Sequence, residues 1–132
     1  MLRAVGRPFV ALLVCGLTVS ACGGPSESER VHATVEAFGR ATAAKDYQRL
    51  CDQLLAPELV EEVESAGLPC ELALRRGLGE VESPTLTIGR IEVRGDRATA
   101  QVRSAAAGQE PSEDTLQLVR VGDSWRIASL TS

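Results

Sequence analysis

Four cysteines are the residues of this chain that can form covalent bonds through their side chains, and they lie at Cys15, Cys22, Cys51 and Cys70. A cysteine thiol can accept a lipid, pair with a second thiol in a disulfide or bind a metal ion. The first two lie in or beside an apolar run near the N-terminus, whereas the last two lie in a segment of mixed composition. The two pairs therefore need separate interpretations.

Cys22 directly follows an apolar run of thirteen residues, 9–21, which Arg3 and Arg7 precede. Such a run is too short to cross a bilayer, which takes about 20 apolar residues, but it is typical of a secretory signal. The residues VSAC, ending at Cys22, resemble the lipobox of bacterial lipoproteins, whose cysteine thiol accepts a diacylglyceryl group and becomes the first mature residue. We therefore expect residues 1–21 to be a lipoprotein signal peptide and Cys22 to carry the lipid.

Cys15 provides an internal comparison for this interpretation. It lies inside the apolar run and follows Val14, whose bulky side chain is a poor one to precede a cleavage site. We assign Cys15 to the removed peptide. Two alternatives stay open, namely an ordinary secreted protein cut near Ala21 and an uncleaved N-terminal anchor.

The residues after Cys22 predict a flexible tether. The sequence GGPSESE, over residues 23–29, contains no large apolar side chain and cannot bury enough surface to offset its own ordering entropy. When extended it would reach about 25 Å. We expect residues 22–29 to be the lipidated cysteine and tether, and 30–132 to be one domain. The acyl chains, palmitate among them, would attach the protein to the extracytoplasmic face of the cell membrane.

The charge balance bears on partners other than the membrane. Without the two arginines of the signal, the mature chain keeps 12 of the 14 basic residues against 18 Asp and Glu, a formal charge of −6. This balance argues against binding of nucleic acid or anionic lipid by the domain itself, because both need basic patches. Thirteen of the basic residues are Arg and the chain has no Asn, which predicts a high-GC source, an actinobacterium.

Cys51 and Cys70 are the cysteines left to the mature domain. An exported protein can form disulfides, and closing a loop of this size contributes about 3 kcal/mol in the chain-entropy model. A metal site would need further ligands, and the other soft ligand, His32, lies far upstream. We expect a Cys51–Cys70 disulfide, with two buried free thiols as the alternative, and no metal or cofactor.

Helical signals fill the first half of the domain. Ser26 and Glu29 have the spacing of a capping box, Asp46 can cap a second helix, Pro57 suits a first helical position and Gly67 a helix end. Apolar residues recur at helical intervals between these signals. The helices are expected over about residues 28–44, 47–55, 57–67 and 70–78.

From Thr85 the apolar period changes to two, which predicts strands. Gly95-Asp96 and Gly122-Asp123 mark hairpin turns. The parity of apolar positions slips near Gly89-Arg90 and near Leu118-Val119, which indicates a β-bulge at each place. The strands are expected over residues 85–93, 97–105, 114–121 and 124–130. The predicted fold is α+β, with N-terminal helices packed on a curved four-stranded antiparallel sheet.

Four segments in this order, KDYQRLCDQLLAPEL, LPCEL, VRGDRATAQV and LVRVGDSWRI, carry a resemblance to a known superfamily. Helices followed by a curved meander ending in Gly-Asp-Ser-Trp-Arg-Ile resemble the nuclear transport factor two-like cone fold. The chain is similar to its small secreted or lipid-anchored actinobacterial members. The resemblance implies a pocket in the mouth of a cone. The isomerases, cyclases and dehydratases of the superfamily place an acidic base, a Tyr or a His there.

Candidates for such a role are few in this chain. His32 lies four residues before Glu36 and is expected to make a solvated contact with it on the first helix. Tyr47 is expected to be a core phenol with its hydroxyl at the rim, and Asp52 has no assigned direction. No matched set of acid, base and donor emerges, so no residue is assigned as catalytic.

Three classes of function remain from the sequence. The first is a lipid-anchored, noncatalytic envelope module that binds either a small apolar ligand in the cone or another envelope protein. The alternative is an isomerase-, cyclase- or dehydratase-like enzyme that uses the cone pocket. A purely structural spacer domain is the third.

Overall fold

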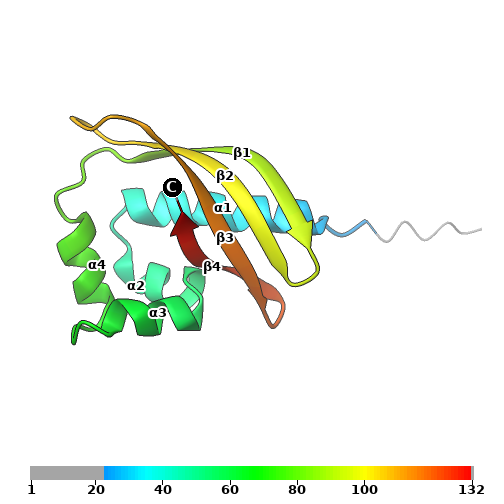
Figure 1. The fold of residues 1–132 in the computed structure, drawn as a ribbon, viewed down its shortest axis with the longest axis horizontal. Helices are drawn as coiled ribbons and strands as arrows, with labels where there is room; N and C mark the ends of the chain where they lie inside the picture. The colour runs from blue at the N-terminus through cyan, green and yellow to red at the C-terminus, as the bar shows by residue number, and fades with distance from the viewer. Residues whose placement is uncertain (1–22, 132) are drawn as a thin grey trace, which may run out of the picture.

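The computed structural model describes residues 23–131, as helices and an antiparallel sheet (Figure 1). The expected signal peptide over 1–21 and the lipidated Cys22 lie outside the described residues. No helix in the described part of the chain is both long and apolar enough to cross a membrane. In chain order the elements are α1 (Glu27–Ala43), α2 (Tyr47–Arg49), the π-helix η1 (Leu50–Leu54), α3 (Pro57–Glu64), α4 (Cys70–Leu78), β1 (Thr85–Arg94), β2 (Arg97–Ala105), β3 (Ser112–Val121) and β4 (Ser124–Thr131).

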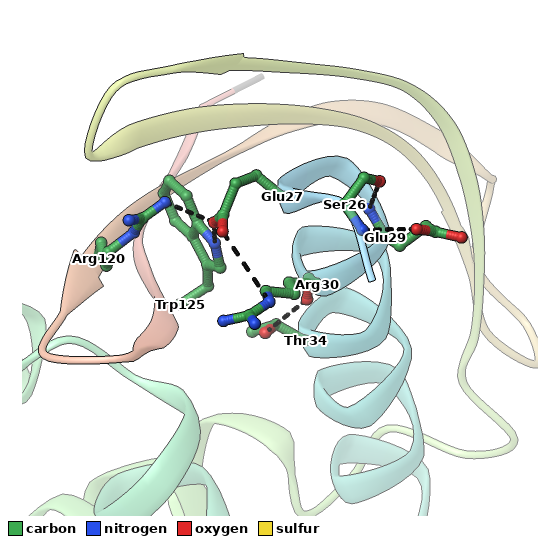
Figure 2. Close-up of polar contacts among 7 residues, drawn as sticks. All are labelled: Ser26, Glu27, Glu29, Arg30, Thr34, Arg120 and Trp125. Carbon is green, nitrogen blue, oxygen red and sulfur yellow. Dashed lines mark hydrogen bonds and ion pairs between the residues drawn. The ribbon is translucent and has the colours of Figure 1, made fainter. Parts of the chain in front are cut away.

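The predicted capping box starts α1. The backbone N–H of Glu29 donates to Ser26 Oγ at 3.2 Å, and the N–H of Ser26 donates to Glu29 Oε2 at 2.6 Å (Figure 2). The bond from the Ser26 backbone N–H, and after it a hydrogen bond from the Ser26 side chain, lower the pKa of the Glu29 carboxyl. Because the cap is at Ser26, residues 27–29, which we expected in the tether, form the first turn of the helix.

The second helix differs from the single α-helix expected over 47–55. Asp46 caps it as predicted, through a bond from the N–H of Arg49 at 3.1 Å. The chain then widens into η1, where the N–H of Leu55 bonds to the carbonyl of Leu50, five residues back, at 2.9 Å. The widened turn is followed by a bond from the N–H of Ala56 to the carbonyl of Ile127 at 2.7 Å, which fastens the helical layer to β4.

The third helix is shorter than expected and ends at Glu64, because Ser65 and Gly67 close a turn instead. None of its residues is fully buried, although its three apolar side chains, Leu59, Val60 and Val63, pack partly buried on the core. The fourth helix occupies the expected residues 70–78. The partly buried side chains of α3 therefore contribute little burial to hold residues 57–78 on the core, so a covalent link to this segment matters.

The predicted disulfide provides that link. Cys51 and Cys70 are bonded, with their Cα atoms 6.1 Å apart, and both residues are buried. The bond ties η1 to the first residue of α4. The disulfide prediction is confirmed.

The sheet has the order β1-β2-β3-β4, all antiparallel, and it curves around α1 (Figure 1). The first predicted bulge is confirmed, because Ile88 pairs with Val102 and Ile91 with Ala100, so that Gly89 and Arg90 face one partner. Both predicted hairpin turns form, with positive φ at Gly95 and at Gly122.

The second bulge lies on the other strand of its pair. Gln117 pairs with Ser129 and Leu118 with Ile127, so the extra residue is Ala128 of β4. β3 keeps an unbroken register with β2 through this region. The parity slip in β3 reflects a change in which side of that strand carries apolar residues: Leu118 is buried, and the following Val119, on the opposite face, is half-buried.

The core lies between α1 and the concave face of the sheet. Val31 and Val35 of α1 meet Leu116 and Leu118 of β3 there, together with Trp125 and other buried residues. A second cluster around Leu50 joins α1 to α2 and η1. Both clusters are built from residues between Val31 and Ile127, so a chain that begins at Gly23 contains the whole folded unit.

Candidate ligand pocket

A cavity of about 270 Å³ opens between the C-terminal half of α1, the end of α4 and one end of the sheet. Its walls are mainly apolar, and they include Phe38, Leu78, Leu86, Val102, Leu116 and Leu130. A Cβ on Gly39 would lie 3.3 Å from the Cβ of Leu86, so the glycine lets β1 approach the helix closely beside the cavity. This is the pocket in the cone mouth that the resemblance implied.

One apolar wall residue stands in the mouth of the cavity. Leu130 of β4 is 61% exposed, the largest exposure among the large apolar residues of the described chain. Exposed apolar side chains beside a concavity are typical of a ligand-binding rim. A substitution at Leu130 therefore changes the entrance of the cavity and leaves the buried core unchanged.

Three polar residues of β2 and β3 line the same cavity, and we call Ser104, Ser112 and Asp114 the Asp114 cluster. Ser104 and Ser112 are directly opposite each other across the strand pair. Their hydroxyl oxygens are 2.8 Å apart, and both hydroxyls contact Asp114 Oδ2, Ser112 at 2.7 Å and Ser104 at 3.1 Å. Each hydroxyl has one proton to donate, so at most two of these three contacts are hydrogen bonds at the same time.

The Asp114 cluster holds a half-buried carboxylate without a countercharge. Within residues 23–131, no basic side chain forms an ion pair with Asp114. The described lining of the cavity contains a second carboxylate, Glu110, and no Lys, Arg or His. The charged groups of the described lining are therefore both carboxylates, which accept hydrogen bonds.

A different carboxylate cluster, the Glu27 cluster, lies at the start of α1 (Figure 2). Glu27 Oε2 accepts hydrogen bonds from Trp125 Nε1 at 2.9 Å and from Arg120 Nη2. Arg120 lies over the Trp125 ring at 5.0 Å from its centroid, and Arg30 approaches Glu27 at 3.9 Å. This cluster binds the first turn of α1 to the β3–β4 hairpin, so its role is structural.

The residues considered from the sequence lie elsewhere than the cavity. His32 and Glu36 form the expected exposed contact on α1, at 3.9 Å. Asp52 is exposed, and its carbonyl accepts a bond from Arg126 at 2.9 Å. Tyr47 is 7% exposed in the second core cluster and is absent from the cavity lining.

The expectation for the Tyr47 hydroxyl was wrong. We expected it at the rim, but it is buried and has no hydrogen-bond partner among the described residues. The reason is the π-turn that follows, since η1 and α4 enclose the ring together with Ala37 and Leu50. Tyr47 therefore acts as packing.

Sequence reasoning missed the Asp114 cluster. The third strand is expected from the sequence to begin at Asp114, whereas it begins at Ser112. The parity of Leu116 and Leu118 extends back to Asp114 and Ser112, and this signal could have placed both on the concave face. The opposing Ser104 follows only once the register of β2 and β3 is known.

Comparison with known proteins identifies the fold. No protein-family model and no curated protein matches the chain. A solved NTF2-like (nuclear transport factor two-like) protein of unknown function from Silicibacter pomeroyi is 20% identical, with a TM-score of 0.56 over 77% of this chain and 90% of that one. A SEC-C motif protein from Rhodopseudomonas palustris is 15% identical, with a TM-score of 0.58 over 81% of each chain.

A third similar structure also has this fold. It is a candidate dehydratase of the NTF2-like family from Streptomyces avermitilis, 17% identical, with a TM-score of 0.55 over 77% of this chain and 91% of that one. Likeness at these identities concerns the fold alone. The chain thus has the α+β cone fold of NTF2-like proteins, as the resemblance predicted.

Proposed function

We propose that this chain is a lipid-anchored protein of the actinobacterial cell envelope whose domain binds a small, largely apolar ligand without turning it over. The observation that supports binding is the apolar cavity of about 270 Å³ in the cone mouth, with an exposed leucine at its entrance. Cavities of this kind, with a few polar groups among apolar walls, are the usual sites of small-molecule binding. The anchor rests on the lipobox sequence that ends at Cys22.

The chemistry of the lining favours binding over catalysis. General acid-base catalysis needs a proton-transfer group and, in most enzymes, a second group that stabilises developing charge. The ionisable groups in the described lining are the carboxylates of Asp114 and Glu110. Beside these carboxylates the described lining offers neutral groups, among them hydroxyls and the Gln109 amide, but no cation and no phenol for a developing negative charge.

The enzyme alternative has one specific observation in its favour, the carboxylate of Asp114 inside the cone mouth. In an isomerase or dehydratase it would take a proton from the substrate. If turnover of a substrate is measured and is lost in Asp114→Asn, the enzyme alternative replaces the binding proposal.

The pocket is tested with N-phenyl-1-naphthylamine, a neutral apolar dye that fluoresces when it leaves water, added to the chain from Gly23 onward. We expect saturable binding to the wild type and at least tenfold weaker binding to Leu130→Glu, which places a charge at the entrance. The matched control is Leu72→Glu on α4, since Leu72 is also an exposed large apolar residue but does not line the cavity. Equal binding by both variants, or no binding by the wild type, would refute the pocket.

The anchor is tested separately in cells. Cys22→Ala should release the protein from membranes or block its maturation, because the thiol is the lipid acceptor. Membrane fractionation and sequencing of the mature N-terminus measure this. A variant that still fractionates with membranes like the parent, with a mature N-terminus elsewhere than position 22, would contradict the anchor while leaving the pocket untouched.

A further inference from the structure

We propose that the ligand of this pocket is an apolar amine, held at one end by the Asp114 cluster and along its length by the apolar walls. The inference rests on the proposed binding function and deepens it by naming the ligand class. It begins with the carboxylate of Asp114, which lies half-buried in the cavity with no basic side chain of the described residues paired to it.

The hydrogen-bond inventory of the cluster decides what can bind there. Both seryl hydroxyls contact one carboxylate oxygen, Oδ2 of Asp114. The cavity lining of the described residues offers this carboxylate no Lys, Arg or His as a countercharge. An ionised carboxylate only accepts hydrogen bonds, so its natural ligand group is a donor. A protonated amine supplies both donors and the missing positive charge, and charge-assisted bonds of this kind are the stronger ones.

The two hydroxyls also orient the carboxylate toward a ligand. Ser104 and Ser112 come from neighbouring strands and both contact Oδ2, so a residue of each strand restrains the carboxylate. A group that is already oriented loses little freedom when the ligand binds. The serines thus position the acceptor.

The rest of the cavity selects against the opposite charge. Glu110 also lines the pocket and adds a second negative charge. A fatty acid or another apolar anion would bring a carboxylate beside two others, and like charges without compensation disfavour binding. The apolar walls of Phe38, Leu86 and Leu130 suit the hydrocarbon part of an amine or of a neutral molecule equally, so the head group is the discriminating feature.

Three probes with the same apolar part test this selection: 4-phenylbutylamine, 4-phenylbutanol and 4-phenylbutanoate at neutral pH. Calorimetric titration of the chain from Gly23 onward should rank the amine first and the anion last. The amine should bind roughly ten to one hundred times tighter than the alcohol, the range typical of a charge-assisted hydrogen bond. Amide resonances of Ser104, Ser112 and Asp114 should shift on addition of the amine.

Matched variants locate the effect. Asp114→Asn should bring the amine within threefold of the alcohol, and Ser104→Ala should weaken amine binding without changing the order. Glu113→Gln is the control, because it removes the same charge from the neighbouring position, which pairs with Arg103 on the opposite face. We expect Glu113→Gln to keep the wild-type preference.

The outcomes separate this inference from the proposed function. An alcohol that binds the wild type as tightly as the amine, or an amine preference that survives Asp114→Asn, overturns the amine assignment and leaves an apolar pocket. If none of the three probes binds and the naphthylamine dye does not bind either, the proposed function fails first. The order in which the wild type binds the amine, the alcohol and the anion is measured without any variant. The inference is therefore still tested if a variant fails to fold.

Discussion

A carboxylate lies at each end of the contact between α1 and the sheet, and the two carboxylates have different partners. At the start of α1, Glu27 accepts bonds from an indole and a guanidinium, and it has a second arginine nearby. At the cone mouth, two seryl hydroxyls contact Asp114, and no basic side chain of residues 23–131 forms an ion pair with it. The countercharges hold Glu27 in a contact between α1 and the β3–β4 hairpin. The Asp114 carboxylate, which lacks a countercharge among the described residues, is the one that we propose binds a ligand.

The largest expected effect is on the helical layer that forms one wall of the open end. Cys51→Ala with Cys70→Ala should lower the free energy of unfolding by about 3 kcal/mol, because the disulfide limits the unfolded chain and α3 has no fully buried residue to compensate. Denaturant unfolding of the oxidised wild type and the double variant measures the loss. Intact mass after alkylation without reductant is the check, since two reactive thiols in the wild type would contradict the bridge.

A smaller loss is expected at the structural carboxylate. Glu27→Ala leaves the partly buried Trp125 Nε1 without its acceptor and should cost about 1–2 kcal/mol, within the usual range for an unpaired donor. Thermal unfolding at neutral pH measures it. The paired variant at the other end, Asp114→Asn, should change stability by no more than about 0.5 kcal/mol, as for most substitutions away from a packed core. Equal losses at the two ends would erase the distinction between them.

Local signals in the sequence predicted most of the elements. The capping box at Ser26, the cap at Asp46 and the glycines of the two hairpin turns each act through neighbouring backbone groups, and each formed as expected. The bulge at Gly89-Arg90 was also predictable, because the parity of the apolar residues changes within β1 itself. The apolar positions before and after the bulge in β1 differ by an odd number of residues, which is visible in the sequence.

The features that sequence reasoning missed depend on pairing between distant segments. The second bulge lies at Ala128 of β4 rather than in β3, as the register between the two strands shows. The π-helix η1 is followed directly by a hydrogen bond from Ala56 to Ile127, a residue far away in the chain. The Asp114 cluster likewise needs Ser104 and Ser112 to meet across two strands. When polar residues extend an apolar alternation, their types alone do not show which face of the sheet they occupy.

The length of α1 has a consequence for how the domain would stand on a membrane. Glu27 begins the helix near the tether, whereas Phe38 and Thr42 line the cavity toward its other end. Fifteen residues separate Glu27 from Thr42, which is about 22 Å at 1.5 Å per residue. In Figure 1 the chain leaves the domain from the N-terminal end of this helix. With the proposed anchor at Cys22, the mouth of the cone would lie toward the end of α1 that is farther from the anchored residue.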